Sequence, residues 1–204
     1  MGAKIMKYEI VPIEKLKPLE KVFPHHLENL RKMILKDNMI KLPLLADKKT
    51  GIVLDGSHRY VFFLTEGYKT VPVRFVDYDN EDIRVGTHLM HKHIIYGSTN
   101  ISKAEVKERG LTGNLYPPRT TRHFFPFRKT DIVNIPLSDL KKGEPVDVKK
   151  LIADVDVQEE IDHNLHYISE IDAETEEIAR YLDEAKQTKT YLKKQIEQME
   201  KEKK

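Results

Sequence analysis

The sequence contains no cysteine, no long apolar run, and no glycine or proline near its end. The absence of cysteine excludes a disulfide scaffold, a thiolate metal site and a cysteine nucleophile. No stretch approaches 18 consecutive apolar residues, which excludes a membrane-spanning helix. The first residues, MGAKIMKYEI, lack the apolar core of a signal peptide. These absences predict a cytoplasmic protein with no membrane partner.

The distributions of charge and of glycine and proline divide the chain into parts of different composition. The net charge is only +2, too weak overall to argue for nucleic acid. An excess of acidic residues after Val157 hides an excess of basic residues before it. All nine glycines lie at or before Gly143, and no proline follows Val157. We therefore predict a globular domain at residues 1–128, a linker at 129–156 and a helix at 157–204.

Short alternating elements in the first part predict a small α/β (α+β) domain with a mixed sheet. Pro24 suits the first turn of a helix, and Ser57 suits the start of a second helix that ends near Gly67. Pro72 places its strand at an edge or at a strand start. The expected strands cover residues 8–16, 42–46, 52–54 and 71–76.

The last part carries an apolar seam at steps of three and four residues, which alternate except across residues 172–178, and Asp172 and Lys189 interrupt it. The seam consists of Ile161, Leu165, Ile168, Thr175, Ile178, Leu182, Ala185, Leu192, Ile196 and Met199. This period favours a coiled coil, as a homodimer or with a partner helix through residues 161–199. The alternative is a helix packed back on its own domain.

The strongest local motif is Leu-Asp-Gly-Ser-His-Arg at residues 54–59, where a strand is expected to meet a helix. Gly56 permits a close backbone approach, and Ser57 can cap the helix. The helix N-terminus attracts phosphate, and His58 and Arg59 add donors. Asp55 would repel phosphate, so a metal or a substrate ammonium is its expected partner. A capped helix with solvated polar residues is the alternative.

This turn resembles that of the ParB/sulfiredoxin superfamily, whose turn and helix hold nucleotide phosphates. The resemblance follows the element order of residues 8–76. Sulfiredoxins have a cysteine where Ser57 stands here, so their activity is excluded. Chromosome-partition ParB proteins continue into helix-turn-helix DNA readers, whereas this chain continues into a segment rich in proline and aromatic residues. The third branch comprises the free-serine kinases.

Two further segments resemble the free-serine kinases. Residues 16–20, Leu-Lys-Pro-Leu-Glu, match a stretch whose glutamate is the catalytic base, which implies that role for Glu20. Leu19 stands where that family has histidine. Residues 113–123 match a Gly-x-x-x-Pro-Pro-Lys-x-Thr-x-His stretch, whose threonine and histidine contact serine. Thr121 and His123 occupy those places, and Arg119 replaces the lysine.

The residue chemistry agrees with this resemblance, because phosphoryl transfer needs a phosphate cradle, a divalent cation and a positioned acceptor. The predicted cradle is Gly56, Ser57, His58 and Arg59; the predicted catalytic residues are Glu20 and Asp55. The predicted amino-acid contacts are Asp55, Thr121, Arg122 and His123. Mg²⁺ is expected, with ADP or ATP as donor, and no protein-only metal site is expected at His88, His91 and His93.

The alternative function is a ParB-like nucleotide-binding regulator that acts through a coiled-coil dimer without catalysis. The heptad tail supports it, and the basic excess before Val157 leaves DNA contact open. The segment at residues 113–123 disfavours DNA, because a partition protein has no use for it.

Overall fold

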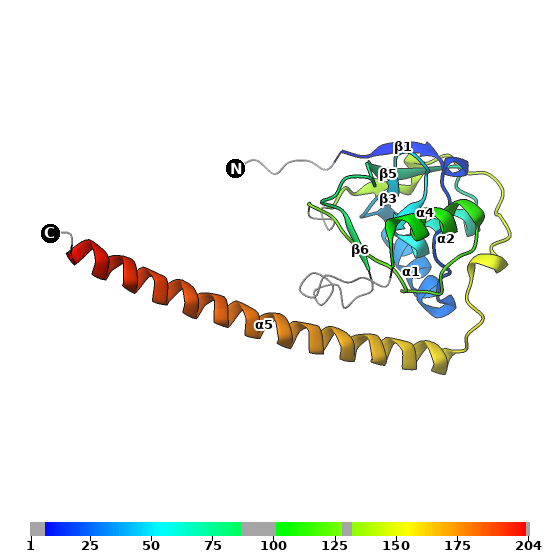
Figure 1. The fold of residues 1–204 in the computed structure, drawn as a ribbon. Helices are drawn as coiled ribbons and strands as arrows, with labels where there is room; N and C mark the ends of the chain where they lie inside the picture. Colours follow the sequence, from blue (N-terminus) through cyan, green and yellow to red (C-terminus); the bar gives the residue numbers. More distant parts are fainter. Residues whose placement is uncertain (1–6, 87–100, 128–131, 203–204) are drawn as a thin grey trace.

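A mixed four-stranded sheet forms the centre of the first part of the chain (Figure 1). The computed structural model describes residues 7–86, 101–127 and 132–202. In the strand order of the sheet, β1 (Glu9–Pro12) pairs antiparallel with β5 (Thr70–Val76), β5 pairs parallel with β3 (Leu44–Asp47), and β3 pairs antiparallel with β4 (Val53–Asp55). The predicted mixed α/β architecture is confirmed.

Two helices cover the larger apolar core, one packed against the sheet and the other packed mainly against the first helix. Helix α1 (Pro24–Asp37) begins with Pro24 in its first turn, as predicted, and buries Leu27 and Ile34. Leu35 is 38% exposed. Helix α2 (Ser57–Thr65) buries Val61 and Phe62 completely.

Two local predictions are corrected. Ser57 is the first helical residue of α2, and the cap position belongs to Gly56, which makes no side-chain hydrogen bond. Pro72 was expected at an edge or at a strand start; it is the third residue of β5, which is an interior strand. The sheet tolerates this proline because pairing with β3 begins one residue later, at Val73 opposite Leu44.

The segment predicted to be a linker, residues 129–156, packs against the domain over its described part. Ile135, Leu137, Leu140 and Val148 lie in the core. The strand β8 (Ile135–Pro136) in this segment pairs with β2 (Met39–Ile40). A strand partner far away in the sequence gives these short apolar stretches a buried place that local composition does not reveal.

The remaining elements are short, except for one further helix. β6 (Arg84–Gly86) pairs antiparallel with β7 (Arg122–Phe124). A second apolar cluster, which contains Leu19, Tyr78, Val106 and Tyr116, lies beneath these elements. The bounds are η1 (Ile13–Lys15), β6 (Arg84–Gly86), α4 (Lys103–Thr112), β7 (Arg122–Phe124), η2 (Leu137–Asp139) and η3 (Lys149–Leu151). His88, His91 and His93 lie outside the described residues.

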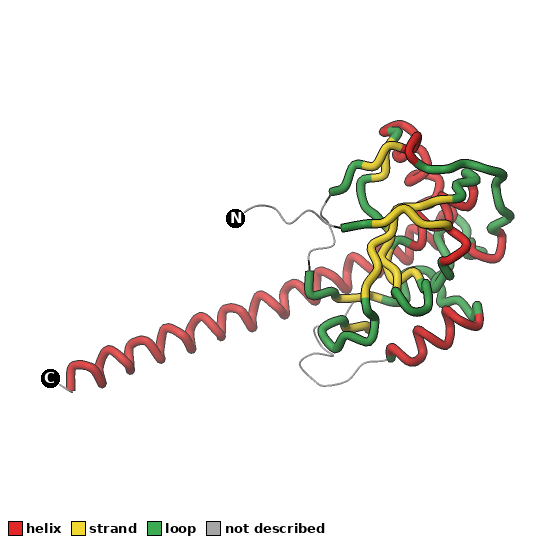
Figure 2. Tube along the Cα trace, turned by 90° about the horizontal axis from the view of Figure 1, so that it is seen from above, coloured by secondary structure: helices red, strands yellow, loops and turns green. Residues whose placement is uncertain are grey.

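Helix α5 (Val157–Glu202) is continuous over 46 residues and begins beside α1. Its buried Glu160 accepts backbone N–H bonds from His25 (3.0 Å) and His26 (2.9 Å), and so caps the first turn of α1. A carboxylate is favourable there because it meets free N–H groups and the positive end of the helix dipole. Figures 1 and 2 show the C-terminal half of α5 extending past the globular part. In the described chain, no helix is both long and apolar enough to span a membrane.

Candidate functional site

The turn from β4 to α2 is built around Gly56. Its φ of 101° is in the left-handed region, and a Cβ there would lie 2.7 Å from the Arg59 guanidinium and 2.9 Å from the Leu44 side chain. Only glycine meets both conditions without strain. The turn allows Asp55, the last residue of β4, to form an ion pair of 3.0 Å with Arg59 in the first turn of α2. The predicted cradle is therefore a local unit with its own charge pair.

His58 has a structural role in addition to its place at the turn. Its Nε2 accepts the backbone N–H of Phe23 at 3.1 Å, which joins the start of α1 to α2. Burial first, and then the neighbouring His26, Arg119 and Arg59, lower the pKa of His58 to about 3. His58 is therefore neutral near pH 7, so it brings no positive charge to a phosphate.

Glu20 lies where the segment before α1 meets the segment after α4. The backbones of residues 19–21 bond on both sides to Tyr116, by Lys21 N–H to Tyr116 O (2.9 Å) and by Tyr116 N–H to Leu19 O (3.0 Å). Leu19, in place of the family's histidine, is 1% exposed and belongs to the second apolar cluster. The backbone pairing therefore holds Glu20 beside the segment that contains Thr121, which lies 101 residues later in the sequence.

Thr121 binds the Glu20 carboxylate directly. Its N–H and its hydroxyl donate to the Glu20 Oε1 at 2.5 and 2.6 Å. Burial raises the pKa of Glu20 from 4.5 to about 7 against the opposing effect of these bonds, and the negative charge of Asp55 raises it further. A carboxylate with this pKa can accept a proton near neutral pH. Thr121 therefore orients the predicted base, which is a role not foreseen from the sequence.

Two polar cavities adjoin at Glu20 and Asp55. One, of about 230 Å³, lies over the turn of α2 and is lined by Gly56, Ser57, His58 and Arg59. The other, of about 310 Å³, is lined by Arg122, His123 and Tyr167. Glu20, Leu54, Asp55, Arg119 and Thr121 line both. All the predicted site residues therefore lie on one continuous hollow, although they come from three separate segments.

His123 is buried on β7, where it pairs with Val85 of β6. A Tyr78 hydroxyl lies 2.9 Å from the His123 Nε2, and the two rings are 5.4 Å apart. Burial raises the pKa of Tyr78, so its hydroxyl stays protonated and can donate to this nitrogen. The pair fixes the His123 ring at the wall of the second cavity.

Helix α5 completes the second cavity. Arg122 forms an ion pair of 3.1 Å with the buried Glu174 of α5. Arg119 donates to the Asn164 Oδ1 at 2.5 Å, and its guanidinium lies 5.1 Å from the Tyr167 ring. The sequence predictions omitted Arg119 and Tyr167 from the site. Arg119 could have been identified as a site residue, because it follows the Pro-Pro pair of the motif at residues 113–123. Nothing near Tyr167 in the sequence signals that Tyr167 lines a cavity.

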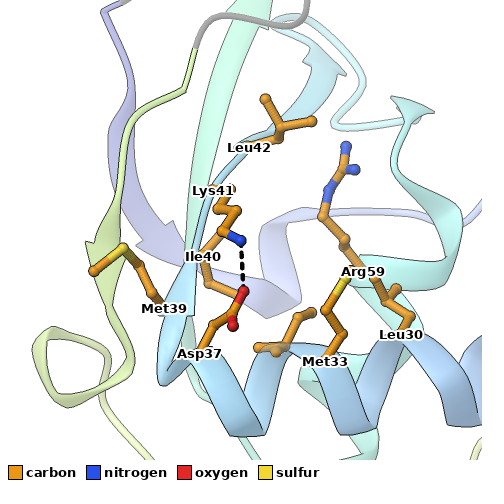
Figure 3. A pocket seen from close by; sticks show the side chains of 9 residues that line it. Leu30, Met33, Asp37, Met39, Ile40, Lys41, Leu42 and Arg59 are labelled. Atoms are coloured by element: carbon orange, nitrogen blue, oxygen red, sulfur yellow. Dashed lines mark hydrogen bonds and ion pairs between the residues drawn. The ribbon is translucent and has the colours of Figure 1, made fainter.

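A third, apolar cavity of about 160 Å³ is lined in part by Arg59 (Figure 3). It shares Leu30 and Arg59 with the cavity over the turn. An ion pair between Lys41 and Asp37 (2.5 Å) lies at its edge. Its other lining residues are Met33, Ile34, Met39, Ile40 and Leu42. The apolar cavity therefore adjoins the cavity over the turn at Leu30 and Arg59.

The carboxylates of this hollow suit a cation that arrives with phosphate. Within residues 7–86, 101–127 and 132–202, no group of three or more His, Cys, Asp or Glu side chains could hold a metal by itself. Mg²⁺ is commonly bound by one or two carboxylates together with phosphate oxygens and water. Glu20 and Asp55 line both polar cavities, so the residues present fit Mg²⁺ bound in that manner.

Comparison with known proteins finds relatives by sequence and by fold, although no protein-family model matches the chain. An ATP-dependent L-serine kinase of Staphylothermus marinus is 30% identical over 106 residues, which cover 50% of this chain and 41% of the kinase. A ParB-like protein of Sulfolobus acidocaldarius is 32% identical over 77 residues, or 38% of either chain. An ADP-dependent L-serine kinase of Thermococcus kodakarensis is 27% identical over 88 residues, covering 41% of this chain and 36% of the kinase.

The solved structures share the fold. A variant of a free serine kinase in complex with AMP superimposes with a TM-score of 0.59 and 18% identity, over 69% of this chain and 96% of that chain. This chain resembles the ParB-like serine kinases. The family resemblance expected from residues 8–123 is thereby confirmed. The sequence alignments span only 36% to 41% of the length of these relatives, so the likeness to ParB-like serine kinases concerns this part of each protein.

Proposed function

We propose that this protein transfers a phosphoryl group from a nucleotide to the hydroxyl of free L-serine or a similar small acceptor. The relatives named as ATP- and ADP-dependent L-serine kinases support the reaction class. The observation that carries the proposal is Glu20, whose carboxylate lies between two polar cavities and has a pKa of about 7. One cavity suits the donor phosphates, and the other suits the acceptor.

The donor phosphates would occupy the cavity over the first turn of α2. The turn supplies free backbone N–H groups and the positive end of a helix dipole, beside Gly56 and Ser57. The buried Arg59 Nε has no hydrogen-bond partner among the described residues, and a phosphate oxygen would satisfy it. The adjoining apolar cavity beside Leu30 and Met33 would take the base of the nucleotide.

The free amino acid would occupy the second cavity. Arg122 is a suitable donor to its carboxylate, because a guanidinium can bind two carboxylate oxygens at once. His123 lies on the same wall. Asp55 would receive the ammonium group. This assignment places each charged group of the substrate beside a protein side chain of the opposite charge.

Glu20 would act as the general base. Its carboxylate accepts the proton of the serine hydroxyl while the hydroxyl oxygen forms a bond to the terminal phosphorus. The bond from that phosphorus to the nucleotide oxygen breaks, and the shortened nucleotide leaves with the electron pair. Thr121 would orient Glu20 by its two hydrogen bonds.

Mg²⁺ bound with the nucleotide would lie near Asp55. When bound, the cation offsets the negative charge that develops on the phosphate oxygens. Asp55 would have two roles at the junction of the cavities, toward the cation and toward the substrate ammonium. Its ion pair with Arg59 would hold it in place.

Phosphorus NMR tests the reaction directly. The protein is mixed with Mg²⁺, L-serine and either ADP or ATP, and the experiment is repeated with Glu20→Gln. Glu14→Gln, at an exposed position in η1, is the matched control. We expect a phosphoserine signal with one or both donors, lost in Glu20→Gln and retained in Glu14→Gln. The productive donor identifies the nucleotide.

The exposed apolar seam of α5 supports a second candidate function, since catalysis does not require such a seam. In this alternative, nucleotide binding would regulate an association of α5 without catalysis. Nucleotide binding with no phosphoserine from either donor would contradict the kinase proposal and support this one. Retention on DNA that falls steeply with salt would add DNA contact to it.

A further inference from the structure

Helix α5 has two distinct faces in its N-terminal half. The face that contacts the globular part is polar and includes Glu160, Asn164 and Glu174. The apolar seam lies beside it and stays exposed, so it does not pack on the described part of the protein's own domain. The large apolar side chains of the seam, with exposed fractions of 40% to 59%, are Ile161, Leu165, Ile168, Ile178, Leu182, Leu192, Ile196 and Met199.

The seam has nearly the same spacing when read in either direction. Reversing the helix about a point near residue 180 places each seam position opposite another seam position, within one residue. The resulting pairs are Ile161 with Met199, Leu165 with Ile196, Ile168 with Leu192, Asp172 with Lys189, Thr175 with Ala185, and Ile178 with Leu182. A second copy of α5 running in the opposite direction would therefore bury the whole seam.

Charge distinguishes this arrangement from a parallel one. Residues 157–179 contain eight acidic side chains and no lysine or arginine. Residues 180–194 contain five basic and two acidic side chains. A parallel pair in register would align the acidic halves, and would place Asp172 against Asp172 and Lys189 against Lys189 within the seam. Like charges at such positions oppose association.

An antiparallel pair converts each of these conflicts into an attraction. The acidic half of each helix would lie beside the basic stretch of the other, and Asp172 would face Lys189 twice, once at each end. We infer that α5 forms an antiparallel coiled coil with α5 of a second copy, with a two-fold axis near residue 180. The seam from residue 161 to residue 199 is about 57 Å long, at about 1.5 Å per residue.

The placement of the globular part is compatible with this dimer. Glu160, Asn164 and Glu174 of α5 contact it, and the C-terminal half of α5 extends beyond it (Figures 1 and 2). The two globular parts would therefore lie toward opposite ends of the paired helices. The partner's C-terminal half would run along the seam of residues 161–175, on the face next to the domain.

Charge exchange tests the pairing in the full chain. Light scattering and sedimentation would measure the dimer dissociation constant for Asp172→Lys, Lys189→Asp and the double exchange. Each single exchange places like charges opposite each other twice, so we expect a dissociation constant raised about tenfold or more. The double exchange restores the opposite charges and should return the constant to within about threefold. A double exchange no better than the single ones would overturn the antiparallel register.

Engineered thiols test the direction independently, because the chain has no cysteine of its own. An oxidised mixture of Ile161→Cys chains and Met199→Cys chains should form a disulfide-linked dimer, whereas neither variant alone should. A disulfide between two Ile161→Cys chains would show a parallel pair. A protein that remains monomeric at about 100 µM, well above the dissociation constants of stable dimers, would overturn self-association itself.

Discussion

Replacing Glu20 by glutamine should stabilise the protein strongly in alkaline solution and only slightly in acid. Burial raises the pKa of Glu20 from 4.5 to about 7. The unfolded chain therefore loses this proton from about pH 4.5 upward, whereas the folded protein holds it until about pH 7. The unfolded state binds fewer protons in this window, so the free energy of unfolding falls as the pH rises.

The size of the effect follows from the pKa change. A change of about 2.5 corresponds to about 3 kcal/mol, at about 1.4 kcal/mol for each pH unit. Glutamine has no proton to lose, and its Oε1 can accept both hydrogen bonds from Thr121. The variant should therefore be more stable than the native protein by about 1 kcal/mol at pH 5 and about 3 kcal/mol at pH 8.

Urea unfolding at the two pH values measures this difference. Glu14→Gln, in which an exposed carboxylate is removed, should match the native protein at both. A Glu20→Gln variant that differs from the native protein equally at pH 5 and pH 8 would refute the reasoning. Such a result would mean that the Glu20 carboxyl is solvated and not held at a raised pKa, and the proposed base would lose its physical support.

Three further outcomes are expected. First, kcat/KM should rise about tenfold per pH unit up to about pH 7 and then level off, because Glu20 must be ionised; a flat profile between pH 5 and pH 9 would contradict this. Second, Gly56→Ala should lower the free energy of unfolding by about 1–3 kcal/mol in urea and weaken nucleotide binding measured by calorimetry, since the φ of 101° and the nearby Arg59 leave no room for a Cβ. Third, Glu174→Gln should raise the KM for serine several-fold with little change in kcat, because Arg122 would lose the ion pair that holds its guanidinium in place at the second cavity; Glu176→Gln, at an exposed position, is the control, and equal effects of the two would exclude a positioning role.

Local chemistry accounts for the parts of the fold that were predicted correctly. Pro24 starts α1 because its fixed φ suits the first turn. The heptad pattern after Val157 forms one helix, because the segment has no glycine or proline to interrupt helical hydrogen bonding. The turn at Gly56 is also local, since the glycine and its neighbours Asp55 and Arg59 lie within five residues.

The errors share a different cause. Local composition at residues 129–156 resembles a connector, but β8 finds a partner in β2 about a hundred residues earlier. Pro72 predicts an edge or a strand start; β5 is an interior strand, and it accepts the proline because β3 begins to pair only at Val73. In each case the pairing partner determines the structure, and no short stretch of sequence identifies that partner.

The same division holds for the site. The sequence by itself determined the residue types, the turn that carries Asp55 and Arg59, and the seam and charge pattern of α5, because these depend on neighbours within a few turns. Only the tertiary structure decided that Thr121 binds Glu20, that His58 is neutral, and that Tyr167 lines the second cavity. Those facts depend on burial and on contacts between distant segments. The pKa of Glu20 in particular follows from the water that packing removes around its carboxyl.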